Sequence, residues 1–163
     1  MLMQPHNTKG LEVVLIEDSL LDARLTIESL KRCRIYHRLT LFRDGAQAID
    51  FLNRDGVFKL APTPDIILLD LVLPDTDGVS FLRRLRADES LGKIPVVILT
   101  SVAEDQRQKE CEQLGVSSYI RKPFHEDKFL NVIRELNVEI LKMDKPSGVG
   151  AYHLQQKTAT PIS

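Results

Sequence analysis

The sequence has no excess of charge of either sign. Its 163 residues include 22 lysines and arginines against 23 aspartates and glutamates, and the formal net charge is −1. A protein that binds nucleic acid or an anionic membrane surface normally carries a basic patch or stripe. Because the basic residues here are scattered among the acidic ones, we expect neither a DNA-binding role nor a membrane partner.

Cysteine is scarce, and no long apolar run is present. The two cysteines, Cys33 and Cys111, lie far apart without a CxxC or metal-like pattern, which suits a reducing cytosol better than a disulfide framework. We interpret both as packing residues. No apolar run approaches membrane-spanning length, and residues 1–10 are polar, without the apolar segment of a signal peptide. We therefore expect a cytoplasmic protein.

Short β-branched apolar runs alternate with longer segments of helical period. The runs occupy residues 11–17, 36–42, 65–70, 96–100 and 117–121. This alternation predicts one α/β domain, a doubly wound five-stranded parallel sheet with helices on both faces. The third run (DIILLD) is apolar on both faces, which predicts a central strand. We expect the domain to span residues 11–142, after a flexible N-terminus (1–10) and before a polar C-terminal tail (143–163).

Acidic, hydroxyl and basic residues end four of the five runs. They are, in chain order, Glu17 and Asp18, then Asp70, then Thr100 and Ser101, and last Lys122 followed by Pro123. The carboxyl ends of parallel strands meet at one edge of a sheet, where ligands bind in this class of fold. The sequence therefore predicts three carboxylates, a hydroxyl and an ammonium at one rim.

These residue types suit phosphoryl transfer to a carboxylate. Crowded carboxylates repel one another at neutral pH, and a hard divalent cation that binds oxygen ligands offsets this repulsion. We expect Mg²⁺, which leaves coordination positions open for phosphate oxygens. We expect Lys122 to neutralise charge on the transferring group, Thr100 to donate a hydrogen bond, and Asp70 to be the nucleophile.

The same residues resemble the motifs of the receiver domain of two-component response regulators. The matching motifs, in order and spacing, are Glu17-Asp18, residues 69–78 (LDLVLPDTDG), Thr100-Ser101 and Lys122-Pro123. The resemblance covers about residues 11–142. It implies a flavodoxin-like sheet of order 2-1-3-4-5 and a regulator that accepts a phosphoryl group from a sensor histidine kinase. Such a regulator is not classed as an enzyme, although it promotes its own phosphorylation and dephosphorylation.

The resemblance implies that Asp70 is the phosphoacceptor. It also implies a metal site made by Glu17, Asp18, Asp70 and the backbone carbonyl of Val72. Two adjacent acids before Ser19 exceed what the capping of a helix needs, which favours a ligand role for the pair.

Residues after the fourth and fifth runs are implied to contact the phosphate. These are Thr100, Ser101 and Lys122, of which Thr100 and Lys122 act with the phosphoacceptor. Thr100 and Tyr119 are implied to form a switch, in which the phosphate draws the Thr100 hydroxyl inward and Tyr119 occupies the vacated space. The bond that precedes Pro123 is cis in this family, an isomer that proline permits at modest cost.

A narrower resemblance is to the stand-alone regulators that partner bacterial and cyanobacterial phytochromes. It rests on residues 17–19, residues 43–45, the long proline-containing loop before Asp65, and residues 67–71. It implies a phytochrome as the sensor kinase. The chain departs from this subgroup at Val72, where Asn is frequent.

We expect the phosphorylated protein to act through contacts with another protein. The length leaves no room for a second folded output domain, so the altered surface must itself bind a partner. This surface is expected to combine the helix at 104–114, the strand at 117–121 and the helix at 125–142. Homodimerisation through it is the form that we expect.

A magnesium-dependent nucleic-acid enzyme of the Toprim type is the main alternative. Such an enzyme pairs a strand-end glutamate with a DxD motif, which Glu17, Asp75 and Asp77 could imitate. It leaves the residues that end the later runs unexplained, and no basic surface favours it. A haloacid-dehalogenase-type phosphatase is less favoured, because it needs a second Asp where this chain has Val72. A flavodoxin-like FMN protein is also disfavoured, because nothing after the first run resembles a phosphate-cradling loop.

Overall fold

The computed structural model describes residues 10–73, 77–101, 106–136 and 154–155. Strands and helices alternate along the chain as the sequence predicts. The elements are β1 (Leu11–Ile16), α1 (Leu20–Arg32), β2 (His37–Phe42), α2 (Gly45–Asn53), the 3₁₀ helix η1 (Gly56–Phe58), β3 (Ile66–Asp70), α3 (Gly78–Ala87), β4 (Val96–Thr100), α4 (Gln106–Gln113), β5 (Ser118–Arg121), α5 (Glu126–Glu135) and β6 (Leu154–Gln155).

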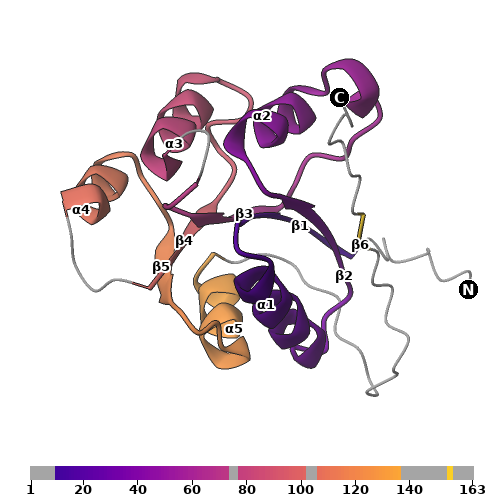
Figure 1. Cartoon of the computed structure of the whole chain (residues 1–163), viewed down its shortest axis with the longest axis vertical. Helices are drawn as coiled ribbons and strands as arrows, with labels where there is room; N and C mark the ends of the chain where they lie inside the picture. The colour runs from indigo at the N-terminus through magenta and orange to yellow at the C-terminus, as the bar shows by residue number, and fades with distance from the viewer. Residues whose placement is uncertain (1–9, 74–76, 102–105, 137–153, 156–163) are drawn as a thin grey trace, which may run out of the picture.

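The five predicted strands form one parallel sheet in the predicted order. The full order is β5-β4-β3-β1-β2-β6, and each neighbouring pair is parallel. Without β6, and counted from β2 to β5, the strands have the flavodoxin-like order 2-1-3-4-5 (Figure 1). The sheet also has an addition that the prediction lacks: β6 pairs with the outer edge of β2, inside the segment predicted to be a tail.

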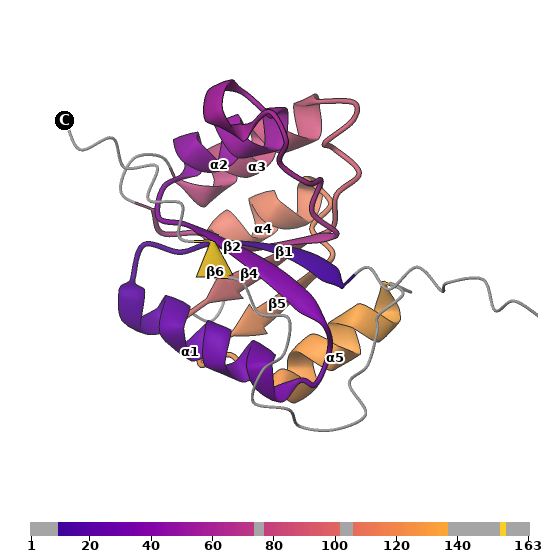
Figure 2. The ribbon, with the colours of Figure 1, turned by 90° about the vertical axis from the view of Figure 1, so that its right-hand side faces the viewer.

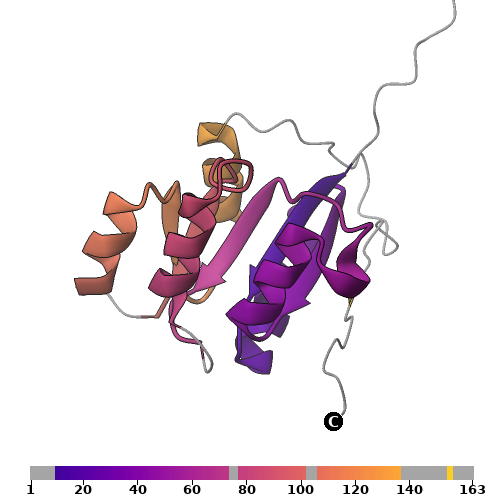
Figure 3. The ribbon, with the colours of Figure 1, turned by 90° about the horizontal axis from the view of Figure 1, so that it is seen from above.

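Helices cover both faces of the sheet. α1 and α5 lie on one face and α2, α3 and α4 on the other (Figures 1 and 2), and α4, α3 and α2 follow one another across their face (Figure 3). Successive β3 residues point to opposite faces, so Ile67 and Leu69 join one core cluster and Ile66 and Leu68 join the other. All four are fully buried, which confirms the central position predicted for this strand.

Capping side chains fix where three of the helices begin. The side chains of Ser19, Asp44 and Asp77 each accept a hydrogen bond from the backbone N–H three residues later, at the start of α1, α2 and α3. The helix predicted at 104–114 is observed as α4, and residues 102–105 lie outside the described residues. The helix predicted at 125–142 is observed as α5, which ends at Glu135. Residues 137–142 also lie outside the described residues.

The burial of the two cysteines agrees with their predicted role in packing. Cys33 and Cys111 are buried and neither takes part in a disulfide, which confirms that both are packing residues. In the part of the chain that the structure describes, none of the helices combines the length and apolarity that crossing a bilayer requires.

Arg86, in the last turn of α3, joins three segments of the fold through backbone carbonyls. Its guanidinium donates to the carbonyls of Gly92 and Ile94 before β4, at 2.8 and 2.9 Å. It also donates to the carbonyls of Leu114 and Gly115 after α4, at 2.9 and 3.1 Å. One side chain therefore holds the connection into β4 and the end of α4 against α3.

We expect Arg86→Ala to lower the free energy of unfolding by at least about 2 kcal/mol, because the substitution leaves several carbonyls without their charged donor. Urea unfolding followed by far-UV circular dichroism measures the loss, since the chain has no tryptophan. Arg83→Ala is the matched control on the same helix. Arg83 makes an exposed ion pair with Glu110 at 2.8 Å, so its loss should cost less than about 1 kcal/mol. Equal losses would contradict the role of Arg86.

Candidate functional site

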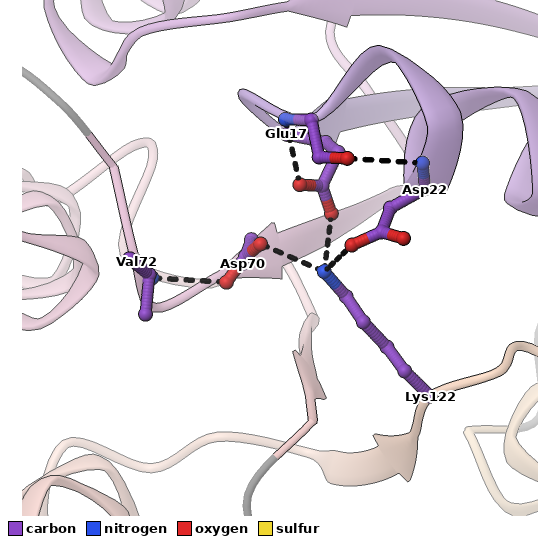
Figure 4. A network of polar contacts seen from close by, with 6 residues as sticks. Glu17, Asp22, Asp70, Val72 and Lys122 are labelled. Carbon is purple, nitrogen blue, oxygen red and sulfur yellow. Dashed lines mark hydrogen bonds and ion pairs between the residues drawn. The ribbon is translucent and has the colours of Figure 1, made fainter.

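The ammonium of Lys122 lies at the centre of a cluster of carboxylates. Lys122 Nζ is 2.8 Å from Glu17 Oε2, 2.8 Å from Asp70 Oδ2 and 2.9 Å from Asp22 Oδ2. Figure 4 shows the three carboxylates pointing toward the lysine. Each distance is that of a charge-assisted hydrogen bond, so all three N–H donors of the ammonium are engaged.

The parallel sheet brings these residues to one edge. Glu17 directly follows β1 and Asp70 ends β3, which is the neighbour of β1 in the sheet. Lys122 directly follows β5, and its backbone N–H donates to the carbonyl of Thr100 at the end of β4, at 2.7 Å. Asp22 lies in the first turn of α1. The rim that the sequence predicts is therefore present at the carboxyl ends of the strands.

Backbone amides hold the oxygens of Glu17 and Asp70 that do not contact Lys122. The N–H of Ser19 donates to Glu17 Oε1 at 3.1 Å, and the N–H of Val72 donates to Asp70 Oδ1 at 2.9 Å. The side chain of Glu17 is 1% exposed and that of Asp70 is 12% exposed. Both carboxylates are thus fixed in orientation, and Asp70 is the one that solvent can reach.

The cluster contains more negative than positive charge, and its pKa values reflect this. Burial, and after it the hydrogen bond with Asp70, together raise the pKa of Glu17 to about 7 against the opposing effect of Lys122. Burial by itself lowers the pKa of Lys122, but its hydrogen bonds to Asp70, Glu17 and Asp22 outweigh this and raise it. Lys122 therefore stays protonated, and its single positive charge does not balance the charge of the three carboxylates.

Asp18 lies beside the cluster rather than in it. Its side chain is 47% exposed and its Oδ1 is 3.7 Å from Arg43 Nη2. The acid that joins Lys122 from this region is instead Asp22, four residues later, which the sequence analysis missed. The spacing Ser19-x-x-Asp22 was an available signal, because it places the acid in the first turn of a helix that begins at the rim.

The other predicted residues lie around the same edge. Thr100 ends β4 and is partly buried, and Ser101 follows it and is exposed. Tyr119 in β5 donates its hydroxyl to the carbonyl of Gln108 in α4 at 3.0 Å, and burial raises its pKa to about 12, so the hydroxyl is a donor at neutral pH. The bond between Lys122 and Pro123 is cis, as the resemblance implies.

The comparisons with known proteins agree with this geometry. A family model described as "Response regulator receiver domain" matches residues 13–134. The chain belongs to this family. The response regulator Rcp1 of Synechocystis sp. is 39% identical to this receiver over 110 residues, which are 68% of this chain and 75% of Rcp1. Among relatives of known structure, the bacteriophytochrome response regulator RtBRR is 35% identical over 87% of each chain, with a TM-score of 0.75.

The donor set of this receiver fits a divalent metal ion. The Mn²⁺-bound form of Rcp1 is 35% identical over 82% of this chain and 99% of that one, with a TM-score of 0.67. Here the available ligand atoms are carboxylate and carbonyl oxygens, which hard divalent cations prefer. No three acidic residues of the described chain are preassembled around a metal position, and Lys122 occupies the point where Glu17 and Asp70 converge. The ammonium thus supplies part of the positive charge that a bound ion would add.

The Toprim alternative has no support among the described residues. Asp77 is exposed and caps α3, where its carboxylate accepts hydrogen bonds from the N–H and the hydroxyl of Ser80, each at 3.0 Å. This is the role of a helix-capping residue. Asp75 lies outside the described residues.

We expect Lys122→Met to lower the free energy of unfolding by about 2 kcal/mol in metal-free buffer, because it leaves a buried carboxylate without its cation. Added Mg²⁺ should recover part of this loss, since the same carboxylates can then bind the ion. Urea unfolding with and without MgCl₂ gives both values. Lys128→Met, at an exposed position in α5, is the control and should stay within about 0.5 kcal/mol of wild type. A Lys122→Met variant as stable as this control would contradict the charge balance described above.

Proposed function

We propose that this receiver accepts a phosphoryl group on Asp70 from the phosphohistidine of a sensor histidine kinase. The contact between Lys122 Nζ and Asp70 Oδ2 supports this most strongly, because it places a fixed positive charge beside the carboxylate that would attack the donor phosphorus. Asp70 also combines a fixed orientation with partial exposure, which a large phosphodonor requires.

In the proposed reaction, an oxygen of Asp70 forms a bond to phosphorus while the phosphorus–nitrogen bond of the phosphohistidine breaks. The released imidazole takes up a proton from water. The N–H of Val72 keeps the Asp70 carboxylate oriented, and Lys122 moves its hydrogen bond from Asp70 to a phosphoryl oxygen. Thr100 and Ser101 donate hydrogen bonds to the other phosphoryl oxygens. This receiver thereby promotes its own phosphorylation, and its dephosphorylation by water at the same site.

We infer that Glu17, Asp18, Asp70 and the Val72 carbonyl hold Mg²⁺. When bound, the ion neutralises charge on the transferring phosphoryl group and helps to orient it. Asp18 reaches this site by turning away from Arg43. That pair is exposed and 3.7 Å apart, so its loss costs little.

We propose that Thr100 and Tyr119 transmit the change to α4. The phosphoryl group draws the Thr100 hydroxyl toward Asp70, and the Tyr119 ring moves into the vacated space. Because the Tyr119 hydroxyl bonds to the Gln108 carbonyl, this movement changes a contact that holds α4 in the unphosphorylated state. The surface made by α4, β5 and α5 is thereby altered.

The partners follow from the relatives and from the surface. RtBRR supports a phytochrome as the sensor kinase, because it is a bacteriophytochrome response regulator. Cys33 and Cys111 take part in no disulfide, which supports a reducing, cytoplasmic location for this exchange. Exposed charges of both signs, Glu112 on α4, Arg121 on β5 and Lys128 on α5, make the altered face capable of pairing with a second copy.

Asp70→Asn should abolish phosphorylation and leave the fold intact, because the change is nearly isosteric and relieves carboxylate crowding. Incubation with acetyl phosphate and MgCl₂ followed by intact-mass spectrometry detects the adduct. Asp77→Asn is the matched control: Asn also caps helices, so this variant should be phosphorylated as fast as wild type. Phosphorylation of Asp70→Asn at the wild-type rate would rule out Asp70 as the acceptor.

Phosphorylation should favour a homodimer through the α4, β5 and α5 face. Sedimentation equilibrium with and without beryllofluoride and Mg²⁺, which together mimic the phosphorylated state, measures the association. We expect tighter dimerisation with the mimic, and weaker dimerisation when Lys128→Glu reverses a charge on the face. Glu28→Lys on the exposed side of α1 is the control and should have no effect. A monomer at high concentration under both conditions would contradict dimerisation.

A further inference from the structure

Asp22 is the acid of the Lys122 cluster to which neither the proposed metal site nor the proposed phosphate site gives a role. Its Oδ2 is 2.9 Å from Lys122 Nζ. Its side chain is 37% exposed, against 1% for Glu17 and 12% for Asp70. Asp22 is therefore the most accessible of the three acceptors, and it comes from a helix rather than from a strand end.

The three acceptors differ in what happens to them during phosphorylation. In the proposed reaction, Glu17 and Asp70 would supply oxygens to the divalent ion and Asp70 would also take the phosphoryl group, so both would lose capacity to accept from the ammonium. The positive charge of the bound ion further weakens their attraction for Lys122. The Asp22 carboxylate is not used in either step. It can therefore keep its hydrogen bond with the lysine throughout the reaction.

We propose that Asp22 positions Lys122 for phosphoryl transfer, by holding the ammonium at the rim after Glu17 and Asp70 release it. The proposal rests on the proposed function. Lysine has a long, flexible side chain that regains rotamer freedom when nothing holds it. Ordering the Lys122 side chain again would cost conformational entropy and slow the reaction. Asp22 touches neither the phosphoryl group nor Asp70 in this scheme, so it is a positioning residue.

The position of Asp22 does not depend on its contact with Lys122. The backbone N–H of Asp22 donates to the capping hydroxyl of Ser19 at 3.2 Å, which fixes the first turn of α1. Further along α1, the hydroxyl of Ser29 donates to the carbonyl of Phe124 at 3.1 Å, beyond the cis bond that follows Lys122. A second contact thus joins α1 to the segment that carries Lys122, so a change at Asp22 should leave that segment in place.

Asp22→Asn tests the proposal because it removes the charge and nearly keeps the size. With acetyl phosphate and saturating MgCl₂, we expect Asp70 to be phosphorylated about 10-fold more slowly, because a neutral amide holds the ammonium more weakly than a carboxylate does. Asp22→Glu, which keeps the carboxylate, should recover most of the rate. Glu28→Gln is the charge control: it removes a carboxylate from α1 that pairs with Lys31 and should leave the rate unchanged.

The ammonium signal of Lys122 in lysine side-chain NMR spectra gives a readout that does not depend on the reaction. Without Mg²⁺, the signal should be visible in wild type and in Asp22→Asn, since Glu17 and Asp70 hold the ammonium. With saturating Mg²⁺, it should persist in wild type and disappear through rapid exchange with water in Asp22→Asn. A purely structural role for Asp22 would make the signal insensitive to Mg²⁺ in both proteins.

The possible failures are distinguishable. A wild-type rate together with a persistent signal in Asp22→Asn would overturn the role of Asp22 and leave Asp70 as the acceptor. If wild type itself formed no adduct on Asp70, the proposed function would fail instead. Circular dichroism checks that each variant is folded, and Asp22→Ser replaces Asp22→Asn, with the same expectations, if that variant does not fold.

Discussion

The ammonium of Lys122 joins side chains from separate parts of the chain, and the rest of the site depends on it. Glu17, Asp22 and Asp70 each place a carboxylate oxygen within 2.9 Å of this one nitrogen. The contacts exist because the sheet sets β1 beside β3 and brings the segment after β5 to the same edge. A shift of one residue in either strand would turn its acid to the opposite face and break the cluster.

The charge balance of this cluster indicates a functional site rather than an ion-pair network that serves stability alone. One ammonium faces three carboxylates, and the buried Glu17 has a pKa near neutrality as a result of burial and of its hydrogen bond with Asp70. A buried ion-pair network is costly unless its charges are well matched, and perturbed groups of this kind concentrate at functional sites. In the proposed reaction, a divalent ion and a phosphoryl group add charges of opposite sign to the same residues, and Lys122 changes partners instead of leaving.

The pattern of apolar runs was enough to predict the strands, and the resemblance to receiver domains implied their order. The residues at the strand ends predicted most of the rim, because a parallel sheet aligns its strand ends whatever the details of packing. Glu17, Asp70 and Lys122 follow from that rule alone. Asp22 does not, since its place beside Lys122 depends on the angle at which α1 leaves the rim, which Ser19 sets by capping. The orientation of Asp18 toward Arg43 is likewise a choice between exposed rotamers. β6 depends on a long-range pairing for which its two residues carry no pattern. The domain limits at 11 and 142 and the separate roles of the site residues remain predictions.

Crystal structures of the metal-free protein and of its complex with beryllofluoride and Mg²⁺ would test the central claim most directly. Beryllofluoride imitates a phosphoryl group on a carboxylate. We expect Lys122 Nζ to contact Glu17, Asp22 and Asp70 in the first structure. In the second, we expect beryllofluoride on Asp70 and Lys122 Nζ bonded to a fluorine. Beryllofluoride on a different residue, or Lys122 directed away from Asp70 in both structures, would contradict the account.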